Sequence, residues 1–516
     1  MPQKKKTHKV LRVLGACFGC LLIFIGFLAY YSANWYADTY GQLGFEAILY
    51  TLLADLGGVE STLIYKYVRS ALIPSLFWTA LLCPVLFGTW RKKLMLVFPK
   101  LKLQLFPMRP AVALVLTLAI SGSFLYRGAE TAEFWDYAAN LGKQSTLYTD
   151  HYQDPATANI TFPQEKRNLI YIFLESMETT FFSREQGGLM DTCVIPELYD
   201  LAENHINFSN SENAVGGIRS GIGSVWTVAA MVTQTAGIPL KAPPDVADGN
   251  SYGNNGVFLP GATSMMDILH ENGYYQTLMV GSDANFGGRA TYFGTHGVDK
   301  IYDLFTARED GLIAPDYKVW WGFEDNHLFR YAQQELPKIA AKEEPFAFYM
   351  LTVDTHHEDG YLCPDCPNTF PNKYENVYAC SSKKTAAFIE WIKTQDFYKD
   401  TTIVVVGDHP TMGNDYIRSI EKPGDENYPR DVYNCFINSA AKPTTVTNRM
   451  AFTVDMFPTT LAAMGCQIQG ERLGLGTNLF SDRKTLGEEL GSNGFNDELN
   501  KPSNYYTSEF YFEKKK

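Results

Sequence analysis

The sequence has 516 residues, of which 46% are hydrophobic and 19% are charged. It is longer than the ~100–200 residues of a typical domain and apolar enough to bury a core, which excludes a disordered or collagen-like chain. Residues 1–126 contain 13 Lys and Arg against 4 Asp and Glu, a net charge of +9, whereas residues 127–516 contain 31 against 52, a net charge of −21. Because affinity for nucleic acid comes from clustered Lys and Arg, this acidic remainder argues against a nucleic-acid partner.

The N-terminal part contains three long uncharged runs. Val13–Tyr31 has 19 residues without a charge, and Ser70–Trp90 and Pro110–Tyr126 follow. The first run matches the ~20 residues needed to cross a bilayer. A cleaved signal peptide is the alternative, but its apolar part is normally only ~7–15 residues long. The sequence therefore predicts a membrane domain over residues 1–129 with about three transmembrane helices.

The flanking charges predict the orientation of this domain. Basic residues without any acidic residue precede the first run and separate the second run from the third. By the positive-inside rule both basic segments are cytoplasmic, so the chain after Arg127 lies outside the cell membrane, in the extracellular or periplasmic space. The segment Leu43–Ala54 is short and contains Glu46, and it is interpreted as interfacial or re-entrant. If it spanned the membrane, the large domain would be cytoplasmic.

The remaining chain alternates apolar runs of strand length with helical segments. The runs are Asn168–Leu174, Tyr275–Val280, Phe346–Thr352 and Thr401–Val406, with a helical stretch at Ser264–Asn272. Uninterrupted apolar strands of this kind predict a mostly parallel sheet covered by helices on both faces. The predicted organisation is a linker over 130–163, a catalytic domain over 164–482 and a C-terminal tail over 483–516 that packs peripherally or frays.

Six cysteines lie in this large domain, and an even number is typical of disulfides in an exported protein. Cys363 and Cys366 form a CxxC pair that could instead be half of a zinc knuckle, with Cys380 as the nearest further ligand. Disulfides are favoured, and their connectivity is left open.

Acidic and imidazole side chains follow three of the predicted strands. Glu175 follows the first, Asp408-His409 the last, and Asp354-Thr355-His356-His357 the strand at Phe346–Thr352. The carboxyl ends of parallel strands form the ligand crevice of open α/β sheets. Any one of these residues alone would be read as a helix cap or a solvated side chain. Together they predict a divalent metal with oxygen and nitrogen ligands.

A glycine-rich loop, Gly216–Thr227, leads into an Ala- and Met-containing helical segment. A hydroxyl at a helix start is ordinarily only a cap, but the same position favours a bound phosphate. Beside a metal, Thr227 could act as a nucleophile.

Five stretches together resemble the lipoteichoic acid synthase and phosphoglycerol transferase group of the sulfatase/alkaline-phosphatase-like superfamily. They are Asn168–Ser176, Val225–Pro239, Leu259–Gly297, Thr352–His357 and Val406–Pro410. The resemblance covers Lys166 to Phe480 and implies an α/β fold with a mixed, mostly parallel sheet flanked by helices. This sequence departs from the lipoteichoic acid synthases at two points. It has Gly287 where they place a Trp, and it has three predicted transmembrane spans where they have five.

The resemblance also implies the site residues. The metal, Mn²⁺ with Mg²⁺ or Zn²⁺ as alternatives, would be held by residues matching Glu175, Thr227, Asp408 and His409. The nucleophile would be Thr227, and His356 would act on the substrate side as a proton carrier. The phosphate-contacting arginine matches Arg289, and Asp283 is a further candidate for binding the glycerol hydroxyls.

The implied activity is transfer of glycerol phosphate from phosphatidylglycerol to a cell-envelope glycan or glycerol-phosphate polymer. The reaction would pass through a phosphorylated Thr227. The alternatives are a phosphoethanolamine transferase of the same superfamily and a non-catalytic relative that binds lipid or polymer. A sulfatase is disfavoured because Thr227 lacks the Cys/Ser-x-Pro-x-Arg context of sulfatase nucleophiles.

Overall fold

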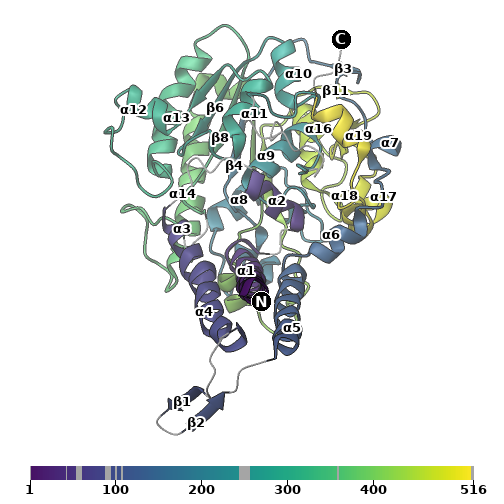
Figure 1. Ribbon diagram of the computed structural model, residues 1–516. Coiled ribbons are helices and arrows are strands. Elements are labelled where there is room, and N and C mark those ends of the chain that lie inside the picture. The colour runs from purple at the N-terminus through teal and green to yellow at the C-terminus, as the bar shows by residue number, and fades with distance from the viewer. Residues whose placement is uncertain are drawn as a thin grey trace. The chain divides into compact units, whose positions relative to one another are not determined.

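A computed structural model describes residues 2–41, 44–53, 61–87, 94–98, 101–105, 109–242, 256–356 and 360–512 of the chain. His357 and both ends of the segment Leu43–Ala54 lie outside the described residues. The chain divides into two compact units, one comprising residues 1–45 and 59–138 and the other residues 46–58 and 139–516. Figure 1 gives the element labels used below.

The first unit is built from long apolar helices. They are α1 (Pro2–Tyr40), α3 (Ser61–Tyr67) continuing through a π-helical turn (Val68–Leu72) into α4 (Ile73–Phe87), α5 (Pro110–Thr131) and α6 (Phe134–Asn140). Strands β1 (Leu94–Phe98) and β2 (Leu101–Leu105) form an antiparallel hairpin between α4 and α5. Helix α1 contacts α5 through Phe27 and Phe124, whose ring centroids lie 4.6 Å apart.

Three of these helical stretches are long and apolar enough to cross a membrane. Within the described residues they are Val13–Tyr40, Leu63–Phe87 and Pro110–Thr131. The second begins before the predicted Ser70, because the helix continues through Lys66 and Arg69. The three predicted apolar spans are present as helices and support a membrane-anchored protein.

The second unit is organised around a seven-stranded sheet with the order β5-β10-β9-β4-β8-β6-β7. Its strands are β4 (Asn168–Leu174), β5 (Gly217–Ile218), β6 (Tyr275–Val280), β7 (Lys300–Tyr302), β8 (Phe346–Leu351), β9 (Thr401–Gly407) and β10 (Val432–Ile437). The five strands from β9 to β7 are parallel, and β10 runs antiparallel to both of its neighbours, β9 and β5. The predicted mixed, mostly parallel sheet is therefore confirmed, and so are its four predicted strands.

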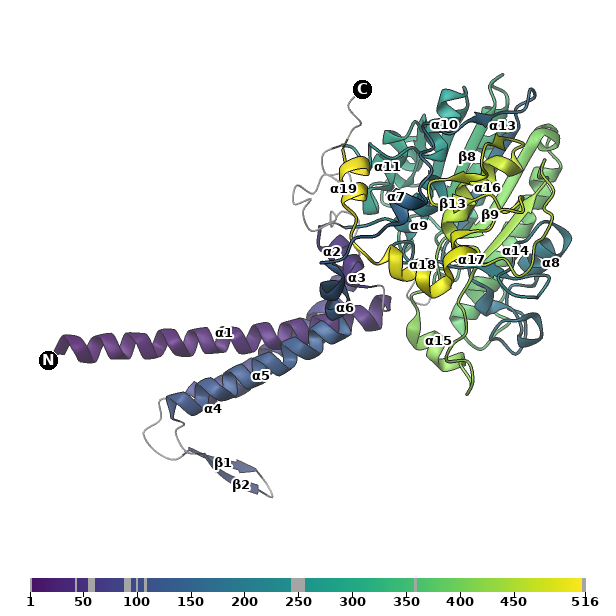
Figure 2. The ribbon, with the colours of Figure 1, turned by 90° about the vertical axis from the view of Figure 1, so that its right-hand side faces the viewer.

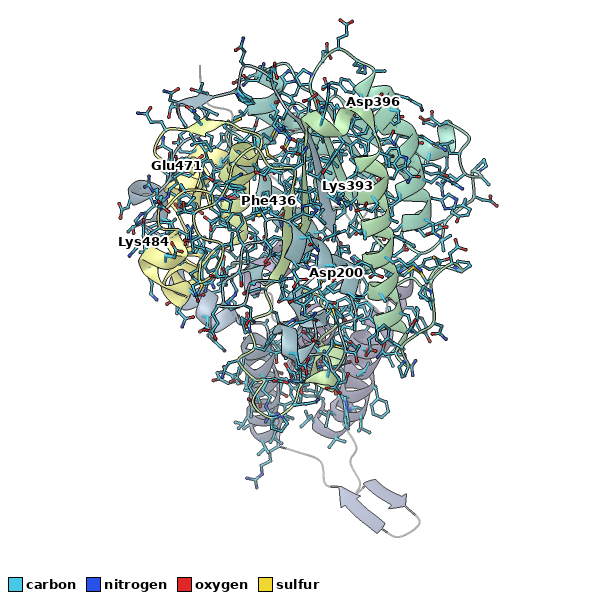
Figure 3. All side chains as sticks on the ribbon, turned by 180° about the vertical axis from the view of Figure 1, so that it is seen from behind. Asp200, Lys393, Asp396, Phe436, Glu471 and Lys484 are labelled. Atoms are coloured by element: carbon cyan, nitrogen blue, oxygen red, sulfur yellow. A yellow bond between two sulfur atoms is a disulfide. The ribbon has the colours of Figure 1, made fainter. Side chains whose placement is uncertain are left out.

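Helices cover both faces of this sheet (Figure 2). One core contains alternate residues of β4, such as Tyr171, with α9 (Thr227–Ala236), α10 (Met265–Glu271), α11 (Arg289–Thr295) and α16 (Met456–Ala463). The other contains Ile170 and Ile172 of the same strand with α8 (Pro196–Asn204), α13 (Asp325–Ala340) and α14 (Lys373–Lys393). Figure 3, seen from behind, labels Asp200 of α8 and Lys393 of α14, two helices of this second face. Successive strand residues point to opposite faces, so a continuous apolar run supplies both cores.

The segments on either side of this sheet belong to the second unit. In the predicted linker, α7 (Leu147–Asp150) buries Leu147 in the first core, and β3 (Ile160–Thr161) pairs with β11 (Gln467–Ile468). The tail, expected to pack peripherally or fray, forms α17 (Leu486–Leu490), α18 (Ser492–Leu499) and α19 (Asn504–Phe510). It buries Phe495, Tyr506 and Phe510 in the same core, because these widely spaced aromatic residues share the inward faces of short helices.

Residues 46–53 of helix α2 (Phe45–Leu53) also belong to the second unit. The Glu46 carboxylate lies 3.5 Å from the Lys241 ammonium, whose side chain is 4% exposed, and Leu49 packs against the first core. The ion pair and the apolar contact thus attach this segment, which the sequence indicated to be interfacial or re-entrant, to the second unit.

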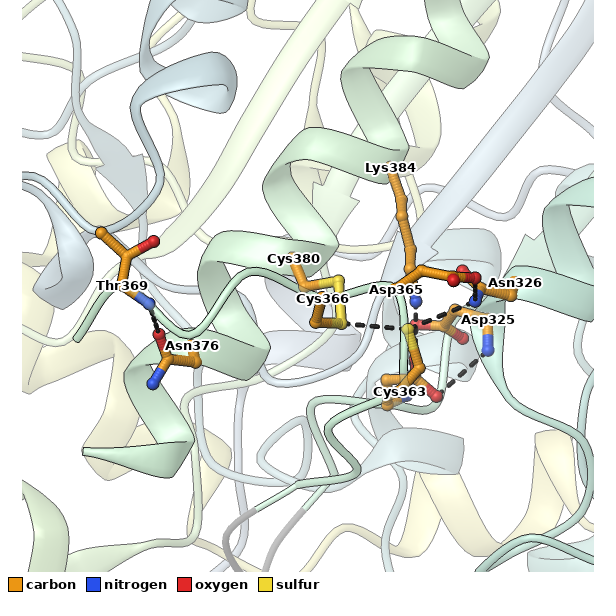
Figure 4. Close-up of a disulfide and its surroundings, with 10 residues drawn as sticks. Asp325, Asn326, Cys363, Asp365, Cys366, Thr369, Asn376, Cys380 and Lys384 are labelled. Atoms are coloured by element: carbon orange, nitrogen blue, oxygen red, sulfur yellow. Dashed lines mark hydrogen bonds and ion pairs between the residues drawn. A yellow bond between two sulfur atoms is a disulfide. The ribbon is translucent and has the colours of Figure 1, made fainter. Parts of the chain in front are cut away.

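One disulfide joins Cys366 to Cys380 of α14, and Figure 4 shows its surroundings. The thiol of Cys363 lies 3.1 Å from the sulfur of Cys366 and accepts a hydrogen bond from the Asn326 amide. Three sulfurs are therefore close together, but two of them are bonded to each other and are not available as thiolate ligands. The zinc alternative is not supported in this state.

The expectation of disulfides throughout the large domain is only partly met. Cys193, Cys363, Cys435 and Cys466 are unpaired. Cys435 and Cys466 are buried in the cores on opposite faces of the sheet, so the sheet itself separates them.

Removing the disulfide is expected to lower the free energy of unfolding by about 3 kcal/mol, because closing a loop of roughly 14 residues restricts the unfolded chain by about that amount. The test is urea denaturation of a C366A/C380A double variant, with Cys193→Ser, which removes an unpaired thiol, as the control. Equal stability of the double variant and the wild type would contradict the assigned pairing.

Candidate active site

The carboxyl ends of the parallel strands bring the predicted metal-binding residues together. In the register between β4 and β9, Leu174 pairs with Gly407, so Glu175 and Asp408 leave adjacent strands at the same level. Strand β8 ends beside β4, and the Thr352 hydroxyl accepts a hydrogen bond from the Glu175 amide at 3.0 Å. The sheet thus brings residues that are more than 200 positions apart in the sequence into one cluster.

The cluster contains Glu175, Asp408 and His409, whose potential ligand atoms all lie within 4.8 Å of one another. His409 Nε2 is 3.5 Å from Glu175 Oε1 and 3.4 Å from Asp408 Oδ2. All three side chains are buried, at 3% exposure or less. The sequence associated these three residues through their positions after predicted strands and through the family resemblance.

Ser176 holds the two carboxylates in place. It adopts a left-handed backbone conformation with φ +55°, which turns the chain sharply after β4. Its amide donates to Asp408 Oδ1 at 2.7 Å, and its hydroxyl donates to Glu175 Oε1 at 2.9 Å. Sequence reasoning missed Ser176, because no motif distinguishes a serine that organises neighbouring acids from one that caps a turn.

The tautomer of His409 is set by its second ring nitrogen. Nδ1 lies 2.8 Å from the Pro410 carbonyl oxygen, which can only accept a hydrogen bond. Nδ1 therefore carries the proton, and Nε2 presents a lone pair to the cluster. Burial lowers the pKa of the His409 imidazole, which favours this neutral, ligating form.

Thr227 completes the group. It is the first residue of helix α9, and its hydroxyl lies 3.3 Å from Glu175 Oε2 and 3.3 Å from His409 Nε2. Trp226 occupies the N-cap position, so the Thr227 hydroxyl is not used to cap the helix. It lies at the helix N-terminus, where free amides and the helix dipole favour an anion such as a phosphoryl group.

The donor set fits a divalent cation. Asp408 Oδ2 is buried and accepts no hydrogen bond from any of the residues that the structure describes. Burial raises the pKa of Asp408 well above its usual range, and the adjacent Glu175 carboxylate raises it further. A buried acceptor without a donor is costly, and a cation between the two carboxylates would relieve both the burial and the repulsion. Carboxylate and imidazole ligands of this kind suit Mn²⁺, Mg²⁺ or Zn²⁺.

His356 lies beside this group, in the loop that follows β8. Burial alone would raise the pKa of the Glu175 carboxyl, but the nearby His356 and His409 imidazoles outweigh this effect, and the pKa is lowered. The Thr355 hydroxyl donates to the Glu175 carbonyl at 2.6 Å, which fixes this loop against the end of β4. His357, the second histidine of the predicted pair, lies outside the described residues.

Asp283 lies in the loop that follows β6, at the same edge of the sheet, and Arg289 is the first residue of α11, directly after that loop. The Arg289 guanidinium donates to the Asp283 carbonyl at 2.7 Å, the Ser282 hydroxyl at 3.0 Å and the Phe286 carbonyl at 3.0 Å. The Asp283 carboxylate accepts hydrogen bonds from the amide and the side chain of Asn285. These contacts lie within the loop itself, so the substrate-binding roles of both residues stay predictions.

Gly287 has φ +66° in the turn before α11. A tryptophan there would be strained, which is a physical reason for glycine at this position of the turn.

Sequence reasoning also missed Trp320 and Trp321. Their rings lie 5.9 Å and 4.7 Å from the His356 ring, between centroids. The only available signal was a Trp pair preceding a glycine in a loop of no recognised motif.

The model of the sulfatase family matches residues 167–466, more than half of the chain. The chain therefore belongs to the sulfatase family, and its mixed sheet carries the polar cluster at the carboxyl ends of the parallel strands.

Its curated relatives include phosphoglycerol transferase I of Escherichia coli strain 55989, which is 32% identical over 274 residues. The alignment covers 52% of this chain and 33% of that protein. The chain thus matches about a third of the length of these curated relatives.

Similar solved structures have low sequence identity. The lipoteichoic acid synthase LtaP from Listeria monocytogenes is 18% identical with a TM-score of 0.47, covering 63% of this chain and 79% of that one. The phosphoethanolamine transferase EptA from Neisseria meningitidis is 11% identical with a TM-score of 0.49, covering 87% and 84%. Membership of the family rests on the family match and not on these two structures.

Proposed function

We propose that this chain is a membrane-anchored, metal-dependent phosphoglycerol transferase. It moves glycerol phosphate from phosphatidylglycerol to a cell-envelope glycan or a teichoic-acid-type polymer, through a covalent intermediate on Thr227. The observation that supports this best is the position of the Thr227 hydroxyl, 3.3 Å from Glu175 Oε2 and 3.3 Å from His409 Nε2, two members of the buried cluster that includes Asp408.

The name of the curated relatives supports glycerol phosphate as the group transferred. The three apolar helices support a lipid donor, since a lipid leaves the bilayer only at high cost and the enzyme must work near the head groups. The disulfide in the second unit supports an extracellular or periplasmic position of the catalytic domain on a multi-pass protein, because disulfides persist in oxidising compartments.

In the proposed mechanism, the cation would be held by Glu175, Asp408, His409 and Thr227. When bound, it would supply Lewis-acid chemistry that lowers the pKa of the Thr227 hydroxyl and offsets negative charge on the phosphoryl group.

In the first step, the Thr227 oxygen attacks phosphorus and the bond from phosphorus to the diacylglycerol oxygen breaks. The Thr227 proton passes to water, and the diacylglycerol oxygen takes up a proton from His356 as it leaves. In the second step, an acceptor hydroxyl gives its proton to His356 and attacks the same phosphorus. The Thr227–phosphorus bond breaks, and the Thr227 oxygen regains a proton from water. Arg289 orients the phosphoryl oxygens, and Asp283 binds the glycerol hydroxyls.

The direct test is release of diacylglycerol from lipid vesicles by the purified full-length chain, with and without Mn²⁺. We expect Mn²⁺-dependent release from phosphatidylglycerol and little from phosphatidylethanolamine. Release from phosphatidylethanolamine alone would identify a phosphoethanolamine transferase. No release from either lipid with any of the three metals would identify a non-catalytic relative.

A further inference from the structure

Trp321 is an aromatic residue beside His356, and its indole N–H has no acceptor among the residues that the structure describes. Its ring centroid lies 4.7 Å from that of His356, and the two rings are tilted by 58°. Its indole nitrogen is buried and has no hydrogen-bond partner among the residues that the structure describes. An indole N–H normally finds an acceptor when it is buried, and a bound ligand could supply the acceptor that the described residues do not.

The loop that carries Trp321 packs against the loop that follows β6. The Phe323 amide donates to the Gly281 carbonyl at 2.9 Å, and Gly322 forms a bridge with Ser282. A β-carbon on Gly322 would lie 1.9 Å from the Gly281 carbonyl oxygen, so only glycine permits this approach. Trp320 has φ +62°, a conformation unusual for a bulky residue and one that is often retained at functional sites.

The same loop is also locked to the loop that carries His356. The Asp325 carboxylate accepts the amides of Val353 at 2.8 Å and Asp354 at 3.2 Å. In return, the Asp354 carboxylate accepts the Asp325 amide at 3.0 Å. These backbone hydrogen bonds therefore hold the loop of Trp321 and the loop of His356 together, with the two rings in contact.

Trp321 also contacts Phe286, in the turn that precedes Arg289. The Trp321 and Phe286 rings lie 5.3 Å apart, and the Arg289 guanidinium lies 5.7 Å from the Phe286 ring. Trp321 thus stands between the residue proposed to carry protons and the residue proposed to bind the phosphoryl oxygens.

We infer that Trp321 is a positioning residue that binds the glycerol phosphate head group and orients His356. Its indole N–H donates to an oxygen of the head group, and its ring packs against the carbons of the glycerol and against the imidazole. This inference rests on the proposed function, since it assigns a further residue to the same substrate.

Two substitutions separate these contributions. Trp321→Phe keeps an aromatic ring but removes the N–H, and Trp321→Ala removes both. The control is Trp391→Phe, which changes a half-buried tryptophan that stacks on Phe388 in α14.

The measurement uses the full chain loaded with Mn²⁺ and titrated calorimetrically with glycerol phosphate. We expect Trp321→Phe to weaken binding by about 10-fold, the upper range for one hydrogen bond. For Trp321→Ala we expect a loss of about 100-fold, with a higher KM for phosphatidylglycerol and a shifted pH profile of kcat, because His356 loses the ring that orients it. The control is expected to match the wild type.

The outcomes distinguish this inference from the function on which it rests. If the wild type neither binds glycerol phosphate nor turns over phosphatidylglycerol, the proposed function is wrong. If the wild type does both, and Trp321→Phe binds as tightly with an unchanged KM and pH profile, the role of Trp321 is wrong. Should Trp321→Ala fail to fold, Trp321→Phe alone decides.

Discussion

Replacing Thr227 by valine is expected to lower the rate of diacylglycerol release by about 10⁴-fold, because valine has nearly the volume of threonine but no hydroxyl to attack phosphorus. Thr227→Ser keeps a hydroxyl at the start of α9 and is expected to retain measurable activity. The measurement is initial rates on phosphatidylglycerol vesicles with saturating Mn²⁺, together with thermal unfolding to show that both variants are folded.

Mass spectrometry of the Thr227 peptide provides the chemical evidence. After brief exposure to phosphatidylglycerol without an acceptor, we expect the wild-type peptide to gain one glycerophosphoryl group and the Thr227→Val peptide to gain none. Turnover by Thr227→Val within 10-fold of the wild-type rate would contradict the assignment of the nucleophile.

Replacing Asp408 by asparagine is expected to have opposite effects on stability in the metal-free and metal-loaded protein. Without metal, the substitution removes repulsion between two buried carboxylates, so the variant is expected to unfold at the same temperature as the wild type or higher. With metal at about 100 times its Kd, binding stabilises the wild type by about 2.7 kcal/mol, and the variant loses most of this gain together with activity.

The matched control for this prediction is Glu178→Gln. Glu178 is equally buried but already has cationic and backbone partners, since the Arg430 guanidinium donates to it at 2.9 Å and the Thr411 amide at 2.8 Å. Removing one partner of a buried ion pair costs about 3–5 kcal/mol, so Glu178→Gln is expected to be destabilised with and without metal. It should still gain stability when Mn²⁺ is added.

Thermal unfolding of both variants after chelation, with and without added Mn²⁺, checks these expectations, and elemental analysis measures the bound metal. A wild-type protein that shows no metal-dependent stabilisation with Mn²⁺, Mg²⁺ or Zn²⁺ would contradict the proposed metal site. Metal binding by Asp408→Asn as tight as that of the wild type would also contradict the proposed metal site.

Much of the sheet could be predicted from the sequence. The strands β4, β6, β8 and β9 are uninterrupted apolar runs, and burial on both faces of a parallel sheet requires that pattern. Strand β10 (Val432–Ile437) was not predicted, because it carries Asn434 in its middle. The structure shows that Asn434 is paired, since its side chain exchanges hydrogen bonds with the backbone of Phe208.

The site could be predicted in its residue types but not in its geometry. Glu175, Asp408 and His409 follow strands, and chain order alone cannot say which strands are neighbours in the sheet. The residues that support the site were even harder to predict from the sequence. Ser176 and Trp321 acquire their roles from a left-handed turn and from the contact between two loops, and neither leaves a periodic pattern in the sequence.

By itself, the sequence determined the apolar helices, the buried strands and the kinds of atoms available for chemistry, because these depend on local hydrophobicity and residue type. Only the tertiary structure decided that β4 lies between β8 and β9, and that a hydroxyl at the start of α9 contacts a carboxylate and an imidazole. It also decided that one buried carboxylate oxygen has no donor among the described residues. The reason is physical: pairing between distant strands is selected by the packing of the whole core, and no local segment contains that information.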